Sequence, residues 1–238
     1  MILEASVHLA NGTLLADGTW FQSPAIQQNL LAATGETLAM VAVSTLVAAI
    51  IGLLLGMALV ATQHGGLYED SAVHWLLSAI VNIGRAIPFI IVVFLLIDFS
   101  RWIAGTGHTW QQFAVPLTLS AAPYFARLVE SNLMGVDQGK VEAVLMMGAS
   151  RQRVLWGVLV REALPALIQS ITILAVTIVG YSAMAGAVGG GGLGAMAQTA
   201  GYYNRNYDVL TIVVVLLVAI VMLIQWLGDM LSRLVDHR

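Results

Sequence analysis

The chain contains long stretches without a single charged side chain. The stretch over residues 37–62 is the clearest, and small residues such as Gly52 and Gly56 lie among its aliphatic side chains. A helix needs about 20 apolar residues to cross the hydrocarbon core of a membrane, and this stretch exceeds that length. The sequence is therefore predicted to belong to a membrane protein.

The composition agrees with this prediction and excludes several other classes. Hydrophobic residues make up 59% of the chain and charged residues only 10%, whereas roughly a quarter of residues are charged in soluble domains. The net charge of −3 leaves no basic excess for a nucleic-acid partner. The absence of cysteine excludes disulfide scaffolds, cysteine-based zinc sites and thiol catalysis.

Five membrane spans are expected from the charge-poor stretches: residues 37–62, 72–97, 111–134, 164–184 and 209–227. The second contains Arg85 and Pro88, which leave its depth and straightness open. A glycine-rich re-entrant or loop segment is expected after the fourth. The predicted fold is an all-α membrane protein with five transmembrane helices.

The basic residues predict the orientation of these spans, because cytoplasmic loops are enriched in Lys and Arg. Six of the ten basic residues lie between the third and fourth spans or after the fifth: Lys140, Arg151, Arg153, Arg161, Arg233 and Arg238. Both regions are predicted to be cytoplasmic, so the N-terminus lies outside and the C-terminus inside. Residues 1–35 then form an extracytoplasmic tail, and residues 36–238 form the five-span domain.

The sequence contains no motif that supports nucleotide or metal binding. The single lysine, Lys140, is followed by Val141, and Met134 stands where the first glycine of a Walker A motif would be. Residues 189–194 fit the spacing of a dinucleotide-binding loop, but they follow a membrane helix rather than a strand. The five histidines form no ligand pair at helical spacing. No catalytic residue, metal or cofactor is therefore expected on this chain.

The predicted cytoplasmic segment over residues 135–163 has a helix–glycine–helix pattern. Apolar residues recur at helical spacing around Val141, Gly148 interrupts them, and Ser150 is placed to cap a second helix that contains Val154. Short amphipathic helices at a membrane surface must rest on another surface. They either lie on the protein's own helix ends or dock a soluble partner.

This segment resembles the EAA loop of ATP-binding-cassette importer permeases, in which Glu-Ala-Ala is followed by a glycine at a fixed distance. Glu142, Ala143, Gly148 and Val158 fall in register with that pattern. Val144 replaces the third-position alanine, and Val160-Arg161 stands where Leu-Pro is expected. The remainder of the chain, from about residue 30, resembles the methionine importer permeases at residues 36–40, 79–83, 85–90, 115–118, 180–184, 186–189 and 191–194.

The resemblance implies a type I permease subunit in the bacterial inner membrane, with a translocation path for D- or L-methionine. It further implies a homodimer, two cytoplasmic ATPase subunits that bind ATP and Mg²⁺, and a periplasmic or lipoprotein substrate-binding protein. Glu142, Ala143, Gly148, Ser150 and Arg151 are the expected ATPase-coupling residues. ATP hydrolysis is expected on the separate ATPase subunit.

Tyr181, Ser182 and Met184 are expected to line the substrate path or gate, because hydroxyl groups within an apolar span are costly unless they face a pore or another helix. The same residues could instead hold helices together. Met184 would suit a mobile, polarizable plug.

Charged residues inside the predicted spans have two interpretations as well. Arg85 either meets a substrate carboxylate, or snorkels or pairs with Glu130 or Asp137. Arg127 with Glu130, and Asp98 with Arg101, are spaced to form ion pairs along one helix.

The glycine-rich segment offers a possible packing surface. Gly186, Gly190 and Gly194 are spaced by four residues and would form one flat face for helix packing across a dimer axis if the segment is helical. Otherwise the segment is a flexible loop tip.

Other functions remain open from the sequence. The chain could be an ABC permease for another amino acid or small solute, a secondary transporter, or a membrane scaffold that recruits a cytoplasmic enzyme. A secondary transporter would need a relay of intramembrane carboxylates, and none lies at the centre of a predicted span.

Overall fold

The structure, a computed structural model, describes residues 23–105 and 110–235, and every regular element in these two ranges is a helix. The helices in chain order are α2 (Pro24–Thr62), α3 (Ser71–Ala86), α4 (Phe89–Ala104), α5 (Trp110–Met134), α6 (Gln138–Met146), α7 (Arg151–Val154), α8 (Leu164–Ala185), α9 (Gly192–Met196) and α10 (Tyr207–Val235). Three π-helical segments join some of them: η3 (Leu155–Val160), η4 (Gly186–Gly190) and η5 (Ala197–Tyr203). The all-α prediction is confirmed.

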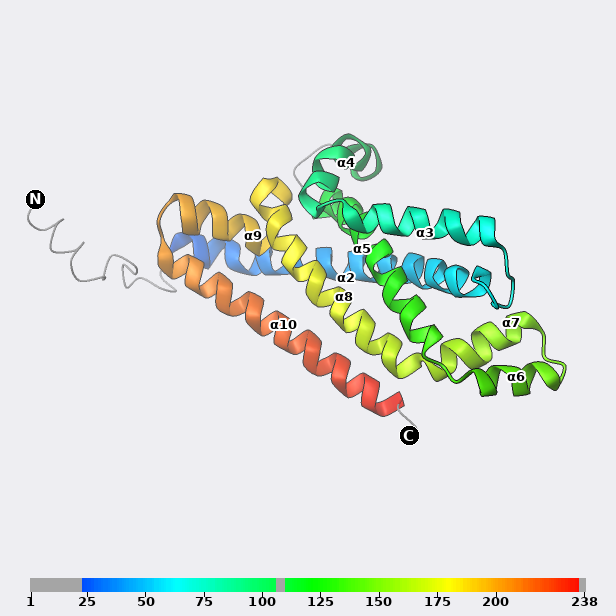
Figure 1. Cartoon of the computed structure of the whole chain (residues 1–238). Helices are drawn as coiled ribbons and strands as arrows, with labels where there is room; N and C mark the ends of the chain where they lie inside the picture. The colour runs from blue at the N-terminus through cyan, green and yellow to red at the C-terminus, as the bar shows by residue number, and fades with distance from the viewer. Residues whose placement is uncertain (1–22, 106–109, 236–238) are drawn as a thin grey trace, which may run out of the picture.

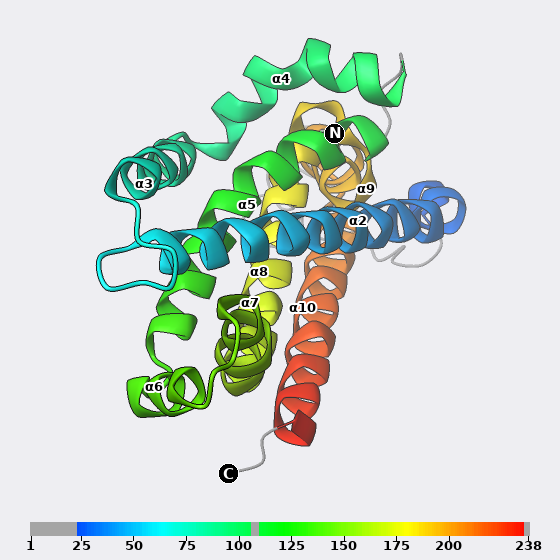
Figure 2. The same ribbon diagram turned by 90° about the vertical axis from the view of Figure 1, so that its right-hand side faces the viewer.

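The centre of the bundle is α5, which packs against α2, α3, α4 and α8. The outer helix α10 runs along α8 and reaches η5 with its N-terminal part (Figure 1). Turned by 90°, the molecule shows α4 crossing one edge of the bundle, with α6 and α7 near the opposite edge (Figure 2). The termini of the described chain lie at opposite ends, the start of α2 beside α9 and the end of α10 towards α6 and α7.

Two glycines allow the close packing of α2 on α5. A side chain added at Gly52 would place its Cβ 2.8 Å from Ala122 O, and one added at Gly56 would lie 2.6 Å from Val129 Cβ. These glycines are four residues apart and so lie on one helix face, the arrangement that lets two membrane helices approach at backbone distance. Ser44, on the same helix, donates a hydrogen bond to Ala114 O at 3.3 Å.

Most predicted spans agree with the helices, but their ends differ. Helices α5 and α8 match their predicted spans to within one or two residues. Helix α10 continues beyond the predicted end of the fifth span, to Val235. Helix α2 begins at Pro24 instead of Thr37, so residues 24–35, assigned from the sequence to the tail, are helical. Residues 1–22 of the predicted tail lie outside the described residues.

The second predicted span is not one straight helix. It is divided into α3 and α4, whose axes differ by 104°. The break lies at Ile87, which is extended with φ −82° and ψ 123°, and at Pro88, which follows it. Proline disfavours helical geometry in the residue before it and donates no backbone hydrogen bond, so the chain turns at this point.

Among the described residues, three helices are long and apolar enough to cross a membrane, or four if the bent pair α3 and α4 counts as one span. Helix α5 has 25 residues but is not among them. It contains Pro116 and Pro123 and the charged pair Arg127 and Glu130. The outward surfaces of α2, α4 and α10 carry exposed apolar side chains suited to lipid, including Leu46, Leu54, Leu95, Val215 and Met222.

Candidate functional site

The helix–glycine–helix prediction for residues 135–163 is confirmed. Helix α6 is capped by Asp137, whose carboxylate accepts a hydrogen bond from Gly139 N at 2.8 Å. Gly148 ends the first helix with φ +81°, a conformation that glycine adopts without strain. Ser150 then caps α7 by accepting a hydrogen bond from Arg153 N at 3.4 Å. We refer to α6, α7, η3 and the residues between them as the coupling loop.

One face of the coupling loop is fixed on the bundle. Val141, Val154 and Leu159 are buried and belong to the same apolar core as α2, α5 and α8. Lys140 on α6 forms an ion pair with Glu162 at 2.5 Å, which ties the start of the loop to its end. The loop is thus packed against the protein's own helix ends, as the first of the two interpretations of the sequence expected.

The other face of the coupling loop is open. Met146 and Met147 are 90% and 85% exposed, and Glu142, Ala143 and Gly148 are exposed beside them. Two almost fully exposed methionine side chains next to a carboxylate are unusual on a surface that contacts only water. Flexible methionine side chains adapt well to a protein partner. The two interpretations of the loop are therefore compatible, because one face rests on the bundle while the other remains available.

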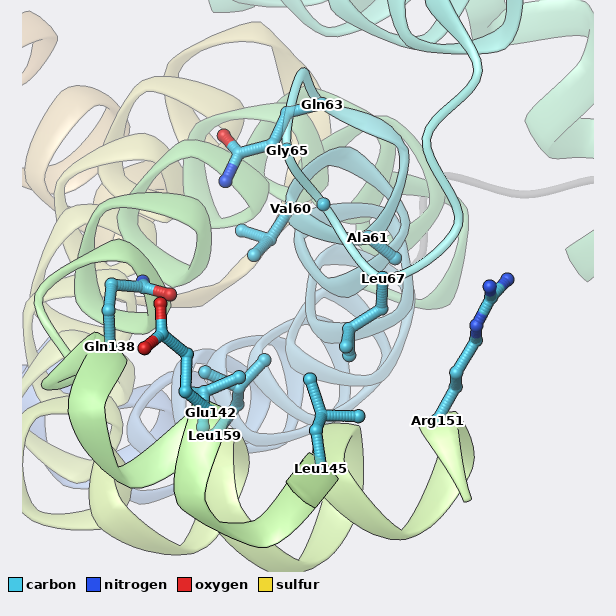
Figure 3. Close-up of a pocket in the computed structure, with 12 residues that line it drawn as sticks. Val60, Ala61, Gln63, Gly65, Leu67, Gln138, Glu142, Leu145, Arg151 and Leu159 are labelled. Atoms are coloured by element: carbon cyan, nitrogen blue, oxygen red, sulfur yellow. The ribbon is translucent and has the colours of Figure 1, made fainter. Parts of the chain in front are cut away.

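A cavity of about 360 Å³ lies between the coupling loop and the segment that joins α2 to α3. Its lining includes Val60, Gln63, Leu67, Gln138, Glu142, Leu145 and Arg151. Figure 3 shows Glu142 and Leu145 rising from α6 towards this segment, with Arg151 at one edge. Both sides of the cavity contribute polar and apolar side chains.

The segment between α2 and α3 contacts the coupling loop directly. The guanidinium carbon of Arg151 lies 5.4 Å from the centre of the Tyr68 ring, within the range of a cation–π interaction. His64 Nδ1 lies 2.6 Å from Glu69 Oε1, and Gly65 N donates to the same carboxylate at 3.1 Å. The hydrogen bond with His64 lowers the pKa of the Glu69 carboxyl, and the one from Gly65 adds to the effect. The segment is thereby held in a compact turn over the cavity.

The residues expected along the substrate path are separated by the structure. Ser182 is buried and donates a hydrogen bond to Val179 O of its own helix at 2.8 Å. The Tyr181 ring stacks on Phe89 with 4.8 Å between ring centroids and 2° between planes, which joins α8 to α4. Met184 is 45% exposed. Of these three residues, Met184 alone is exposed within the single chain, whereas Tyr181 packs α8 against α4 and Ser182 bonds within α8.

Arg85 does not pair with Glu130 or Asp137. It is exposed at the end of α3. Glu130 is instead paired with Arg127 at 2.5 Å, and the carboxylate of Asp137 caps α6. The predicted pairs Arg127–Glu130 and Asp98–Arg101 are both present, the second at 3.2 Å. Arg127 also donates to Asn82 Oδ1 at 3.0 Å and so links α5 to α3.

Gly186, Gly190 and Gly194 do not form one helical face. Gly189, Gly191 and Gly192 have φ values of +100°, +74° and +70°, so the chain turns sharply between η4 and α9. This turn, which we call the elbow, brings Gly186 against Gly194: a Cβ on Gly186 would lie 2.7 Å from Gly194 Cα. The glycines pack helices, but within one subunit and on either side of a turn.

Comparison with known proteins places this geometry in a family. Residues 48–238 match the model of the binding-protein-dependent transport system inner membrane component. The chain belongs to this permease family. A probable D-methionine transport system permease protein of Vibrio cholerae is 44% identical over 209 residues, covering 88% of this chain and 93% of its relative. The methionine import system permease protein of Bacillus subtilis is 41% identical over 177 residues, covering 74% of this chain and 80% of that one.

A solved structure confirms the fold of the permease. A chain from the inward-facing MetNI methionine ABC transporter aligns with a TM-score of 0.88 at 44% identity, covering 90% of this permease and all of that chain. The expected type I importer architecture is therefore present.

Sequence reasoning missed two sets of contacts between distant segments of this permease. Glu36 and Thr37 on α2 accept hydrogen bonds from the backbone of Gly192 and Leu193 at the elbow. The Lys140–Glu162 ion pair was also missed. The partners of Glu36 and Thr37 lie 156 residues away in the chain, so no local pattern could have found them.

Metal binding has no geometric basis in the described part of the permease. Residues 23–105 and 110–235 contain no group of three or more His, Asp or Glu side chains placed to hold a metal ion.

Proposed function

We propose that this permease is the transmembrane subunit of an ATP-driven importer for methionine. The proposal rests on the coupling loop, whose one face is fixed in the core while its other face presents Met146 and Met147 to a partner. The similarity to methionine permeases over most of the chain supports the substrate assignment. A binding protein outside the membrane would deliver methionine, and a separate ATPase would bind ATP and Mg²⁺.

The ATPase-coupling residues are proposed to be Glu142, Ala143, Gly148, Ser150 and Arg151. Gly148 and Ser150 set the shape of the loop, and Arg151 joins it to Tyr68. Glu142 and Ala143 are exposed on α6 and available to a partner. An ATPase that docks here can move the loop and, through the buried valines, the ends of α2, α5 and α8.

A homodimer would supply two coupling loops to two ATPase subunits through one two-fold axis. Helix α8 carries exposed positions at helical spacing, Ile173, Gly180 and Met184, and the line continues into η4 at Ala187. This face has no partner within the described part of the chain, since the buried face of α8 contacts α5, α10 and α2. Two such faces around an axis would form the translocation path, with Met184 of each copy as a gate.

Uptake by vesicles tests the function and the gate together. Vesicles containing the permease, its ATPase and its binding protein should accumulate labelled methionine. This uptake should require ATP on the side of the membrane where the ATPase lies. Truncation of the gate in Met184→Ala removes packing contacts from a dry constriction. It should raise ATP hydrolysis without loaded binding protein by several-fold, or cause leakage.

Each arm of this experiment has an outcome that rejects it. ATP-dependent uptake of another solute in place of methionine would reject the substrate. Unchanged uptake and unchanged basal hydrolysis in Met184→Ala would place the gate elsewhere. Met222→Ala, which truncates the same kind of side chain on the lipid-facing surface of α10, is the matched control.

A further inference from the structure

Two side chains of α2 are bonded to the backbone of the elbow. Glu36 Oε2 accepts a hydrogen bond from Gly192 N at 2.7 Å, and Thr37 Oγ1 accepts one from Leu193 N at 2.8 Å. Both amides lie at the start of α9, where no carbonyl of the same helix is available to accept them. We call these two hydrogen bonds the clasp.

The Thr37 hydrogen bond of the clasp is buried, the Glu36 hydrogen bond is partly buried, and both are closely fitted. Thr37 is 2% exposed, and Gly192 and Leu193 are buried. A Cβ on Gly192 would lie 2.6 Å from Thr37 Oγ1, and one on Gly191 would lie 2.7 Å from Glu36 Oε2. Both glycines also have positive φ values. Only glycine at these positions lets α2 approach the elbow closely enough for the hydrogen bonds to form.

Two separate points on α2 contact the two regions proposed to act in transport. The clasp fixes the elbow, which directly follows the helix that carries Met184. Val60 and Ala61, near the C-terminal end of α2, line the cavity under the coupling loop. Helix α2 is unbroken between these points. At 1.5 Å rise per residue it spans about 36 Å from Thr37 to Ala61.

We propose that the clasp positions the gate: α2 holds the elbow through Glu36 and Thr37 and transmits movement of the coupling loop to α8. This inference rests on the proposed function, and it deepens that function by assigning positioning residues outside the substrate path. The acceptor oxygens of Glu36 and Thr37, rather than the charge of Glu36, carry the role. When the clasp opens, the elbow and Met184 are released together.

Paired substitutions separate hydrogen bonding from charge. Glu36→Gln keeps the length and an acceptor oxygen but removes the charge, whereas Glu36→Asp keeps the charge but shortens the side chain beyond reach of Gly192 N. Thr37→Val removes the hydroxyl at nearly constant volume, and Thr37→Ser restores it. Thr34→Val is the matched control, because the Thr34 hydroxyl donates a hydrogen bond to Leu30 O of its own helix.

The first measurement is ATP hydrolysis without loaded binding protein, in vesicles that contain the complete complex. Glu36→Asp and Thr37→Val should each raise it about five- to tenfold, the effect expected for the loss of one buried or partly buried hydrogen bond. Glu36→Gln, Thr37→Ser and Thr34→Val should stay close to the unmodified complex. The opposite order, with Glu36→Asp unaffected and Glu36→Gln defective, would overturn the proposal in favour of a role for the charge.

The second measurement is independent of transport and hydrolysis. The chain has no native cysteine, so the labelling rate of Met184→Cys reports on the elbow region alone. Combined with Thr37→Val it should rise about tenfold, with parallel loss of hydrogen-exchange protection over residues 186–200. Faster hydrogen exchange at the elbow, with unchanged labelling of Met184→Cys and unchanged ATP hydrolysis, would show that the clasp is only a structural contact and would reject the proposal.

The two measurements keep the two proposals apart. If the unmodified complex fails to take up methionine, the proposed function fails, and the effect of the clasp on Met184→Cys labelling still decides this inference. If methionine uptake and its coupling to ATP hydrolysis are as proposed, but Thr37→Val leaves the labelling rate of Met184→Cys unchanged, only the proposal about the clasp is rejected.

Discussion

At the scale of single residues, Gly148 is the most exacting position in the coupling loop. Its φ of +81° is unfavourable for residues with a side chain, although the space around it is open. Gly148→Leu should therefore act through backbone strain of about 1–2 kcal/mol rather than through a clash. The chain should still insert and fold, while ATPase co-purification and stimulated hydrolysis fall several-fold.

Two further variants test this explanation of Gly148. Gly148→Asn should be milder, because asparagine tolerates the left-handed conformation better than leucine. Gly157→Ala is the control, since Gly157 in the π-helical segment η3 has no positive φ, and the nearest atom to its Cβ position is Arg153 Cγ at 3.9 Å. Full hydrolysis in Gly148→Leu would remove this turn from the coupling mechanism.

Residues with local roles were predicted correctly, and residues with distant partners were not. Gly148 and Ser150 shape the backbone next to them, so a glycine break followed by a capping serine can be recognised in the sequence. Glu36 and Thr37 act on an elbow that only the folded chain brings to them. Ser182 shows the same limit, because its burial depends on the folded bundle and not on its local sequence.

At the scale of elements, the contact between α2 and α5 organises the bundle. Gly56→Ala would place a methyl group 2.6 Å from Val129 Cβ, and overpacking of this kind costs about 1–3 kcal/mol. The variant should unfold at a lower temperature in detergent than the unmodified permease. Gly35→Ala is the matched control on the same helix, because nothing lies within 4 Å of its Cβ position. Equal unfolding temperatures for the two variants would show that the contact is not tightly packed.

Helix positions followed from apolar length, whereas helix breaks and contacts required the fold. The charge-free stretches located α5 and α8 closely. Pro88 was recognised as an interruption, but the 104° bend depends on how α3 and α4 pack on α5. The spacing of Gly186, Gly190 and Gly194 suggested one helix face, and the positive φ of the glycines between them instead produces a turn.

At the scale of the whole molecule, the fold brings the basic residues of α6 and α7 and the basic end of α10 to one end of the bundle. Lys140, Arg151 and Arg153 lie on α6 and α7, and Arg233 lies at the end of α10, on the same side of the molecule (Figure 1). Arg205 lies near the start of α10, beside the elbow end of the bundle. Enrichment of Lys and Arg on the cytoplasmic side then predicts that the coupling loop faces the cytoplasm.

Single cysteines test this orientation. Asn204 and Ser150 are both exposed, and they lie at opposite ends of the bundle. In cells whose outer barrier has been opened, an impermeant thiol reagent should label Asn204→Cys and spare Ser150→Cys. Disruption of the inner membrane should then make both react, which controls for burial of either site. Labelling of Ser150→Cys in intact inner membranes, with Asn204→Cys protected, would invert the orientation and place the coupling loop out of reach of any cytoplasmic ATPase.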